Sequence, residues 1–314
     1  MTRNPRPALL CITPAPAIDR TAHVERIAHD EILRPREMFV LPGGKGVNAA
    51  RAAVALGGRA VTTGIAGGHA GRWIVESLSE EGLEPHWSFA KAECRTAYVV
   101  VDETGETVLV YERSTPATLG EYEAFLRLLE QRLLPASARA IVAGSIPSGL
   151  PPHSHGAIVE AAHRARVPLL VDATDAGLLS ALKAGPDIVK IGRIEVVETG
   201  IVGSEASAAE AAMALVDHGA RLGVVTDGAR EVAAASADAV WRLVVPRIEA
   251  VNPVGSGDSF NAGFSLALMD GAELSTALVK GVAAGTANAL TKSAGSPDPV
   301  TTAALEDDVT VSME

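Results

Sequence analysis

Short apolar runs alternate with segments of helical periodicity along the second half of the chain. Apolar runs at 140–143 and 168–172 are separated by a helical pattern at 154–165, and another helical pattern at 121–134 precedes them. Runs this short are typical of strands buried on both faces, and their alternation with helices is typical of a parallel sheet. The pattern predicts an α/β fold, a doubly wound and mostly parallel sheet with helices on both faces.

The first third of the chain carries strand patterns that do not follow this alternation. Residues 95–101 and 106–111 are apolar runs joined by a turn at 102–105, which predicts a β-hairpin. Residues 37–41 predict a further strand, whereas 21–36 show no helical stripe. These strands are too many for the parallel core.

Composition excludes several classes of protein. The chain has 314 residues, 47% of them hydrophobic, which suffices for one large α/β domain or two smaller ones. Its net charge of -11 and thinly spread Lys and Arg argue against a nucleic-acid surface. No apolar run is long enough to cross a membrane. Cys11 and Cys94 lack metal-ligand spacing and no secretion leader is readable, so we expect a cytoplasmic protein.

A glycine-rich turn opens a helix at 252–264. Glycines leave backbone N–H groups uncovered, and the positive end of a helix attracts an anion such as phosphate. Asp258 is suited to take a proton from an attacking hydroxyl, while the N–H groups of Gly255, Ser256 and Gly257 would stabilise a phosphoryl group in transfer. The alternative is an ordinary turn in which Asp258 caps the helix.

A second glycine cluster, at 42–51, also runs into a helix. Together the two clusters resemble the two signature motifs of the PfkB/ribokinase family of sugar kinases, one near each end of the chain. The segments Pro16–Asp19 and Gly144–Pro151 are most similar to the 1-phosphofructokinase and tagatose-6-phosphate kinase branch, although Ala15 replaces the Asn of that branch. The resemblance covers most of the chain.

The resemblance implies a ribokinase-like fold in one kinase domain, residues 1–314. Strands from about 20–41 and 94–112 would form a small β-sheet lid over the sugar site. A lid that excludes water protects ATP from hydrolysis and strengthens the electrostatics of a kinase site. In the family such a lid often forms the dimer contact, so we expect a homodimer.

The sugar site is expected between the lid and the first glycine cluster. Asp19 follows the apolar run 8–12 and a proline turn, which places it at the carboxyl end of a strand, where ligands bind in open α/β sheets. It would accept hydrogen bonds from sugar hydroxyls, and a turn-forming Asp is the alternative. By resemblance, Arg34 and Arg95 hold a phosphate already on the sugar; a surface charge is the alternative for each. The cluster contributes the remaining substrate-binding candidates, Gly43, Gly44, Lys45 and Asn48.

The resemblance also implies ATP and Mg²⁺, together with a monovalent cation such as K⁺. Lys190 and Glu195 stand in the family segment that organises magnesium and phosphates, and Glu195 would hold the ion through water. Gly192 replaces the Asn of that segment, which removes one side-chain oxygen. The remaining nucleotide-binding candidates are Thr226, Gly228 and Asn288, the last on a small-residue helix at 281–290.

The favoured function is ATP-dependent phosphoryl transfer to a hydroxyl of a sugar or sugar phosphate. The altered residue Gly192 keeps open a non-catalytic sugar- or nucleotide-binding protein on the same fold. A nicotinamide-dependent dehydrogenase is disfavoured because the glycines at 64–71 lack the Gly-x-Gly-x-x-Gly spacing. His153 and His155 have no acidic or cysteine partners at ligand spacing, so a surface helix start is favoured over a metal site.

Overall fold

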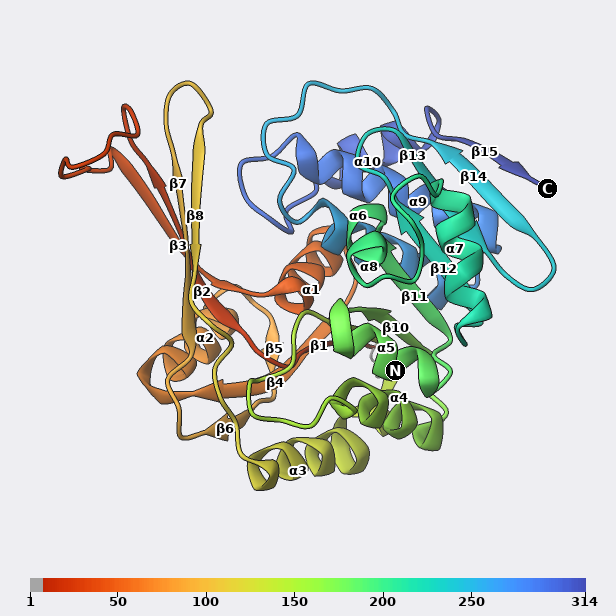
Figure 1. Cartoon of the computed structure of the whole chain (residues 1–314), viewed down its shortest axis with the longest axis horizontal. Helices are drawn as coiled ribbons and strands as arrows, with labels where there is room; N and C mark the ends of the chain where they lie inside the picture. The colour runs from red at the N-terminus through yellow and green to blue at the C-terminus, as the bar shows by residue number, and fades with distance from the viewer. Residues whose placement is uncertain (1–7) are drawn as a thin grey trace, which may run out of the picture.

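The computed structural model describes residues 8–314 and contains a large sheet and a separate four-stranded sheet (Figure 1). In spatial order, the strands of the large sheet are β15 (Thr310–Met313), β14 (Val240–Val244), β13 (Glu231–Ala235), β12 (Leu222–Thr226), β11 (Ile188–Gly192), β10 (Leu169–Asp172), β9 (Ser137–Ala143), β1 (Ala8–Thr13), β4 (Ala60–Gly67) and β5 (Glu84–Pro85), with β6 (Ser88–Ala90) paired to β4. Pairing is parallel from β12 to β5 and antiparallel from β12 to β15.

The parallel strands are apolar because both of their faces are covered. Every residue of β1, β4 and β10 is buried, as expected for a sheet with helices on both sides. The strand order reverses beside β1, which pairs with β4 on one side and with β9 on the other. The carboxyl ends of the strands at such a switch point are where open α/β sheets bind ligands.

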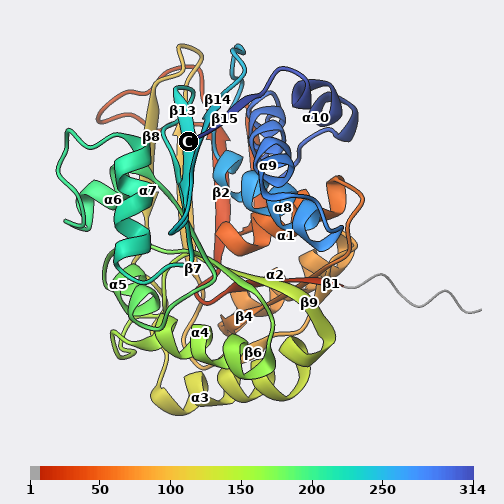
Figure 2. The same cartoon turned by 90° about the vertical axis from the view of Figure 1, so that its right-hand side faces the viewer.

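Helices cover both faces of the large sheet (Figure 2). One face carries α3 (Leu119–Leu128), α4 (Ser154–Ala165), α5 (Asp175–Lys183), α6 (Arg193–Glu198) and α7 (Ala208–Asp217). The other carries α1 (Lys45–Ala55), α2 (Gly68–Glu80), α8 (Ser256–Met269) and α9 (Leu274–Ala289), with α10 (Pro299–Glu306) packed on α9. Each face has its own hydrophobic core. The predicted fold class is confirmed. Within the described part of the chain, no helix has the length and apolarity that a membrane span requires.

The four-stranded sheet has the order β3-β2-β7-β8 and stands apart from the large sheet in Figure 1. Its strands are β2 (Ala17–His23), β3 (Glu37–Gly43), β7 (Arg95–Val101) and β8 (Thr107–Tyr111). The hairpin β7–β8 and the strand at β3 were expected from their apolar runs, but β2 was not, because its polar residues hide the alternation. Asp19 therefore lies within β2 and not, as predicted, at the carboxyl end of the first strand.

One predicted helix is shorter than expected. In place of a helix over 121–134, α3 ends at Leu128 and continues as a π-helical turn (Leu129–Leu133) and a 3₁₀ turn (Leu134–Ala136). Pro135 has no N–H group to continue an α-helix. The helix also starts earlier, because the Thr118 hydroxyl accepts a hydrogen bond from the N–H of Glu121 in a capping box.

Candidate active site

Asp258 lies in the first turn of α8 and is buried. The helix begins after Gly255, whose φ of 82° is a conformation that glycine adopts readily. The alternative in which Asp258 caps the helix is therefore wrong. The Asp258 carboxylate accepts a hydrogen bond from Asn48 Nδ2 of α1 at 2.9 Å. Figure 1 shows α1 beside the base of the four-stranded sheet, and α8 packs against α1.

The surroundings of Asp258 favour its protonated form more than water does. Burial raises the pKa of Asp258, and the negative charge of Asp172 raises it further. The Asn48 hydrogen bond and the ammonium groups of two lysines oppose this rise, and the pKa settles at about 6. A carboxylate with this pKa is mostly ionised at neutral pH and is more basic than an exposed aspartate, which suits a general base.

Asp172 is a site residue that the sequence analysis did not select. It ends β10 and is 1% exposed, and its Oδ1 accepts a hydrogen bond from Lys45 Nζ at 2.8 Å. Its Oδ2 accepts from Lys190 Nζ at 3.2 Å and from Asn261 Nδ2 at 2.9 Å. Burial alone would raise the pKa of Asp172, but the charges of Lys190 and Lys45 outweigh it and hold the pKa well below its usual range.

The two lysines of the site lie on either side of Asp172. Lys45 was expected at the sugar, but its ammonium lies between Asp172 and Glu195, 3.0 Å from Glu195 Oε1. Lys190 is buried and lies against the start of α8, where a methyl group at Gly257 would press on its Nζ. The N–H of Ser256 donates to the carbonyl of Pro253. Ser259 N–H donates to the carbonyl of Gly255 at 2.9 Å, so among the described residues the first-turn N–H groups of α8 left without an acceptor are those of Gly257 and Asp258.

Asp19 on β2 lies next to the first glycine cluster, which begins at the end of the neighbouring strand β3. Gly43 pairs with Ala17 of β2, and a Cβ at Gly43 would overlap the Asp19 carboxylate. Only glycine fits there without displacing Asp19. Gly44 is the N-cap of α1, with a φ of 117°. Burial raises the pKa of Asp19 to about 6, and the positive charges of Arg51 and Arg95 moderate the rise.

Arg51 and Arg95 both lie near Asp19, and Arg51 was not among the residues selected from the sequence. Arg95 Nη2 is 3.4 Å from Ser145 Oγ, and Arg95 Nε is buried without a hydrogen-bond partner. Arg51 binds Pro42 O at 2.9 Å and Asn48 Oδ1 at 3.2 Å, so it braces the glycine cluster. Its position on α1, one helical turn after Asn48, could have identified it from the sequence. Arg34 is exposed in the loop between β2 and β3, and the described residues offer it no hydrogen bond or ion pair.

A cavity of about 340 Å³ opens on the other side of the start of α8. Thr226 and Gly228 at the end of β12 line it, together with Ser256 and Gly257. Its remaining walls are mostly small or apolar: Ala229, Val232, Val245, Pro246, Ile248, Ala250, Pro253, Phe260, Val282, Gly285, Thr286 and Ala289. Such a cavity suits a flat heteroaromatic ring with a phosphate tail directed at the helix start.

Asn288 does not line this cavity. Its Nδ2 donates to Val254 O at 2.9 Å, and its Oδ1 accepts from Gly295 N at 2.8 Å and Ser296 N at 3.2 Å. Asn288 is thus placed to hold the 252–256 loop in position. We expected it beside the nucleotide because it lies on α9, but the helix directs this side chain toward the loop.

His155 is buried rather than on the surface, and its Nε2 lies 3.0 Å from Gly144 O. The prediction of a surface helix start is wrong for His155, because α4 packs this side chain into the protein. Burial lowers the pKa of His155 to about 4. Within residues 8–314, no group of three or more His, Cys, Asp and Glu side chains could hold a metal ion.

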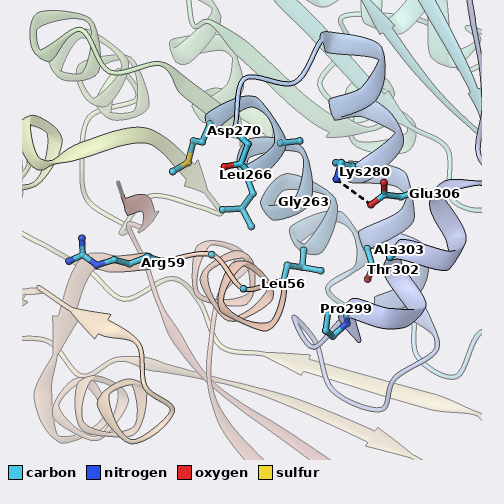
Figure 3. Close-up of a pocket in the computed structure, with 14 residues that line it drawn as sticks. Leu56, Arg59, Gly263, Leu266, Asp270, Lys280, Pro299, Thr302, Ala303 and Glu306 are labelled. Atoms are coloured by element: carbon cyan, nitrogen blue, oxygen red, sulfur yellow. Dashed lines mark ion pairs between the residues drawn. The ribbon is translucent and has the colours of Figure 1, made fainter. Parts of the chain in front are cut away.

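A second cavity, of about 390 Å³, lies at the opposite ends of α1 and α8 (Figure 3). Leu56, Leu266 and Asp270 line it, and the ion pair between Lys280 and Glu306, at 3.5 Å, spans one wall. None of the candidate site residues lines it. The candidate catalytic and binding residues therefore lie away from this second cavity.

The whole architecture has close counterparts among solved structures. *Escherichia coli* phosphofructokinase-2 in complex with potassium has a TM-score of 0.88 at 26% sequence identity, covering 96% of this chain and 99% of that one. The same enzyme in complex with fructose-6-phosphate has a TM-score of 0.86 at 25% identity, covering 95% and 99%. *Arabidopsis thaliana* ribokinase complexed with ribose and ATP has a TM-score of 0.76 at 20% identity, covering 96% and 98%, which shows a shared fold.

A family model described as pfkB family carbohydrate kinase matches residues 8–301, nearly the whole chain. This match disfavours the non-catalytic alternative and leaves no support for a dehydrogenase. The start of α8 places a buried carboxylate next to residues that line a cavity, an arrangement compatible with phosphoryl transfer. The chain belongs to the pfkB family of carbohydrate kinases and is an ATP-dependent sugar kinase.

Proposed function

We propose that the acceptor is a sugar that already carries a phosphate, and that Asp258 is the base that activates its hydroxyl. The observation that carries the proposal is the position of the start of α8 between two binding regions. Ser256 and Gly257 line the nucleotide cavity, while Asp258 is joined through Asn48 to the glycine cluster that faces Asp19. A phosphoryl group in transfer between ATP and the sugar would pass this helix start.

In this reaction the attacking hydroxyl gives its proton to Asp258 as its oxygen forms a bond to the γ-phosphorus, and the bond from that phosphorus to the bridging oxygen breaks, so that ADP leaves. The first-turn N–H groups of α8 and the helix dipole stabilise the charge on the transferred group. Lys190 adds a fixed positive charge beside Gly257. Asp172 keeps Lys190 in place through its hydrogen bond.

The family implies that Mg²⁺ accompanies ATP, where it neutralises charge on the phosphates. Asp172 and Glu195 supply carboxylate oxygens, the ligand type that Mg²⁺ prefers, and one ammonium group spans both of them. We propose that Glu195 holds the hydrated ion through water. A monovalent cation such as K⁺ belongs to the same proposal, because the *E. coli* structure is a potassium complex.

Arg95 supports a phosphorylated acceptor. Its guanidinium has a buried Nε without a partner, and its Nη2 is within reach of Ser145 at the end of β9. An unpaired buried donor is costly, and a phosphate oxygen would satisfy it with a charge-assisted hydrogen bond. The *E. coli* relative was solved with fructose-6-phosphate, a sugar of this class. Asp19 would accept hydrogen bonds from the sugar hydroxyls.

We also propose that residues 1–314 form one kinase domain whose four-stranded sheet is the lid, and that two copies join through this lid. All residues of the edge strand β8 are exposed, including Leu109 (60%), Val110 (56%) and Tyr111 (60%). An exposed apolar edge strand is a surface that proteins normally cover. E. coli phosphofructokinase-2 also has a tetrameric inhibited form. Free cysteines at 11 and 94 fit a reducing cytoplasm.

Asp258→Asn should lower kcat by about 100-fold or more and leave the Kd for ATP nearly unchanged, since the shape is kept and the proton acceptor is lost. Steady-state kinetics and calorimetry measure the two quantities. The control is Asp270→Asn at the exposed far end of α8. A kcat above about one tenth of wild type would contradict the assignment.

The pH profile of kcat/KM for the sugar should fall on the acid side of pH 6. Asp258 and Asp19 both have a pKa of about 6 and both act as carboxylates, so protonation of either stops the reaction. Below pH 5 the slope should approach two, and in Asp258→Asn, measured on its residual activity, it should approach one. A profile that stays level between pH 5 and 7 would rule out both carboxylates.

Arg95→Ala should raise KM for a phosphosugar by about 10- to 100-fold, the value of one charged hydrogen bond, and should change KM for its unphosphorylated parent little. The panel is fructose 1-phosphate, fructose 6-phosphate, tagatose 6-phosphate and the free sugars. Arg132→Ala, on the exposed side of the π-helical turn, is the control. Equal effects on both kinds of sugar would show that the acceptor is a free sugar.

Leu109→Glu should convert a homodimer to a monomer, because burial of a carboxylate in the lid contact is unfavourable. Sedimentation velocity measures the mass. Val300→Glu, at a position 77% exposed on α10, should leave the mass unchanged. A wild-type protein that is monomeric at micromolar concentration, or a Leu109→Glu variant that stays dimeric, would refute the lid dimer.

A further inference from the structure

Two carboxylates and two ammonium groups form one connected cluster behind the start of α8. Lys45 Nζ is 2.8 Å from Asp172 Oδ1 and 3.0 Å from Glu195 Oε1, and Lys190 Nζ is 3.2 Å from Asp172 Oδ2. The formal charges of these four groups cancel. A divalent cation that approached the two carboxylates would therefore find their charges balanced by the two lysines, with the Lys45 ammonium already in contact with both of them.

Every oxygen of the two carboxylates already accepts a hydrogen bond. Glu195 Oε2 accepts from Gly192 N at 3.0 Å, and Glu195 Oε1 accepts from Lys45. On Asp172, Oδ1 accepts from Lys45, and Oδ2 accepts from Lys190 and Asn261. Lys45 is thus the one group that occupies an oxygen of both carboxylates. A hydrated metal ion between them would need those same oxygens.

The two lysines differ in their freedom to move. Lys190 lies on β11 and its side chain is 5% exposed. Lys45 is the first residue of α1 and its side chain is 35% exposed. A lysine has a flexible four-carbon stem and three rotatable donors, so Lys45 can turn from one anion to another. Lys190 is held as a permanent counter-ion of Asp172.

We infer that Lys45 is a displaceable cation that holds the place of a divalent metal ion between Asp172 and Glu195 until the nucleotide arrives. The phosphates of ATP give the Lys45 ammonium a new partner, and its departure leaves the carboxylate pair with a net negative charge. The pair can then accept the hydrated ion that comes with ATP. The inference rests on the proposed function for the identity of the nucleotide, but the exclusion of a metal ion from the free protein follows from the cluster itself.

The cluster makes metal binding conditional on nucleotide binding. Without Lys45, the two carboxylates would repel each other and attract any free divalent ion. With Lys45 and Lys190 both in place, the formal charges of the two carboxylates are balanced. The nucleotide-free protein is therefore expected to reject free divalent ions although it holds two carboxylates within reach of one cation.

The test measures Mn²⁺ binding to the nucleotide-free protein by the loss of the free-ion electron paramagnetic resonance signal. Mn²⁺ accepts the same oxygen ligands as Mg²⁺. Lys45→Met removes the charge and keeps the length of the side chain, so it should bind Mn²⁺ about tenfold more tightly than wild type, or better. Lys280→Met, which removes a half-exposed lysine paired to Glu306, should behave as wild type.

Glu195→Gln added to Lys45→Met should abolish the gain, which places the new ion at this pair. Should Lys45→Met fail to fold by circular dichroism, Lys45→Gln provides the same charge removal with a polar side chain. Equal Mn²⁺ affinities of wild type and the folded Lys45 variant would overturn the inference, as would a gain that survives Glu195→Gln. No nucleotide or sugar is present, so failure here is distinct from failure of the proposed phosphoryl transfer, which the kinetics of Asp258→Asn detect.

Discussion

The active site depends on one buried negative charge, that of Asp172. A carboxylate that is 1% exposed is unfavourable unless its charge is matched and its oxygens are hydrogen-bonded. Lys45, Lys190 and Asn261 meet both requirements, and they come from α1, β11 and α8. The cost of leaving Asp172 unpaired therefore fixes the relative positions of three elements that are far apart in sequence.

Asp172 also sets the chemistry of its neighbour. Its charge is one reason why the pKa of Asp258 rises to about 6, while the lysines that neutralise Asp172 keep that rise moderate. Two aspartates in one site thus differ in the direction of their pKa shifts. The one with two ammonium partners stays ionised throughout the physiological range, and the one with an amide partner is the more basic of the two.

Much of the fold could be predicted because buried strands leave an unmistakable pattern. The runs at β1, β9, β10 and β12 are apolar because helices cover both of their faces. Strand β2 could not be predicted, since a lid strand buries only a little of each face and carries Asp19, Arg20 and Thr21. The two glycine clusters marked the helix starts correctly, because a glycine at a positive φ is a local requirement.

The site was harder to predict because charge pairing is not local. Asp172 ends an apolar strand, which was the signal used for Asp19, but nothing near it in sequence names Lys45, 127 residues away, as a partner. Lys45 was assigned to the sugar from its motif alone. It contacts Asp172 at the end of β10 and Glu195 just after β11, and the pairing of these two strands brings the two carboxylates to one ammonium group. Asn288 shows the same limit, since its partners lie on two separate loops.

The four-stranded sheet is joined to the large sheet by chain connections and not by strand pairing. The cavity beside the start of α8 is built on the large sheet and on α8 and α9, whereas Asp19 and Arg95 belong to the four-stranded sheet. Under the proposed function, substitutions in the four-stranded sheet would alter the acceptor site without disturbing the strands that line the cavity. This separation would give the architecture a route to new sugars through changes in about two dozen residues of that sheet, while the residues around the start of α8 remain as they are.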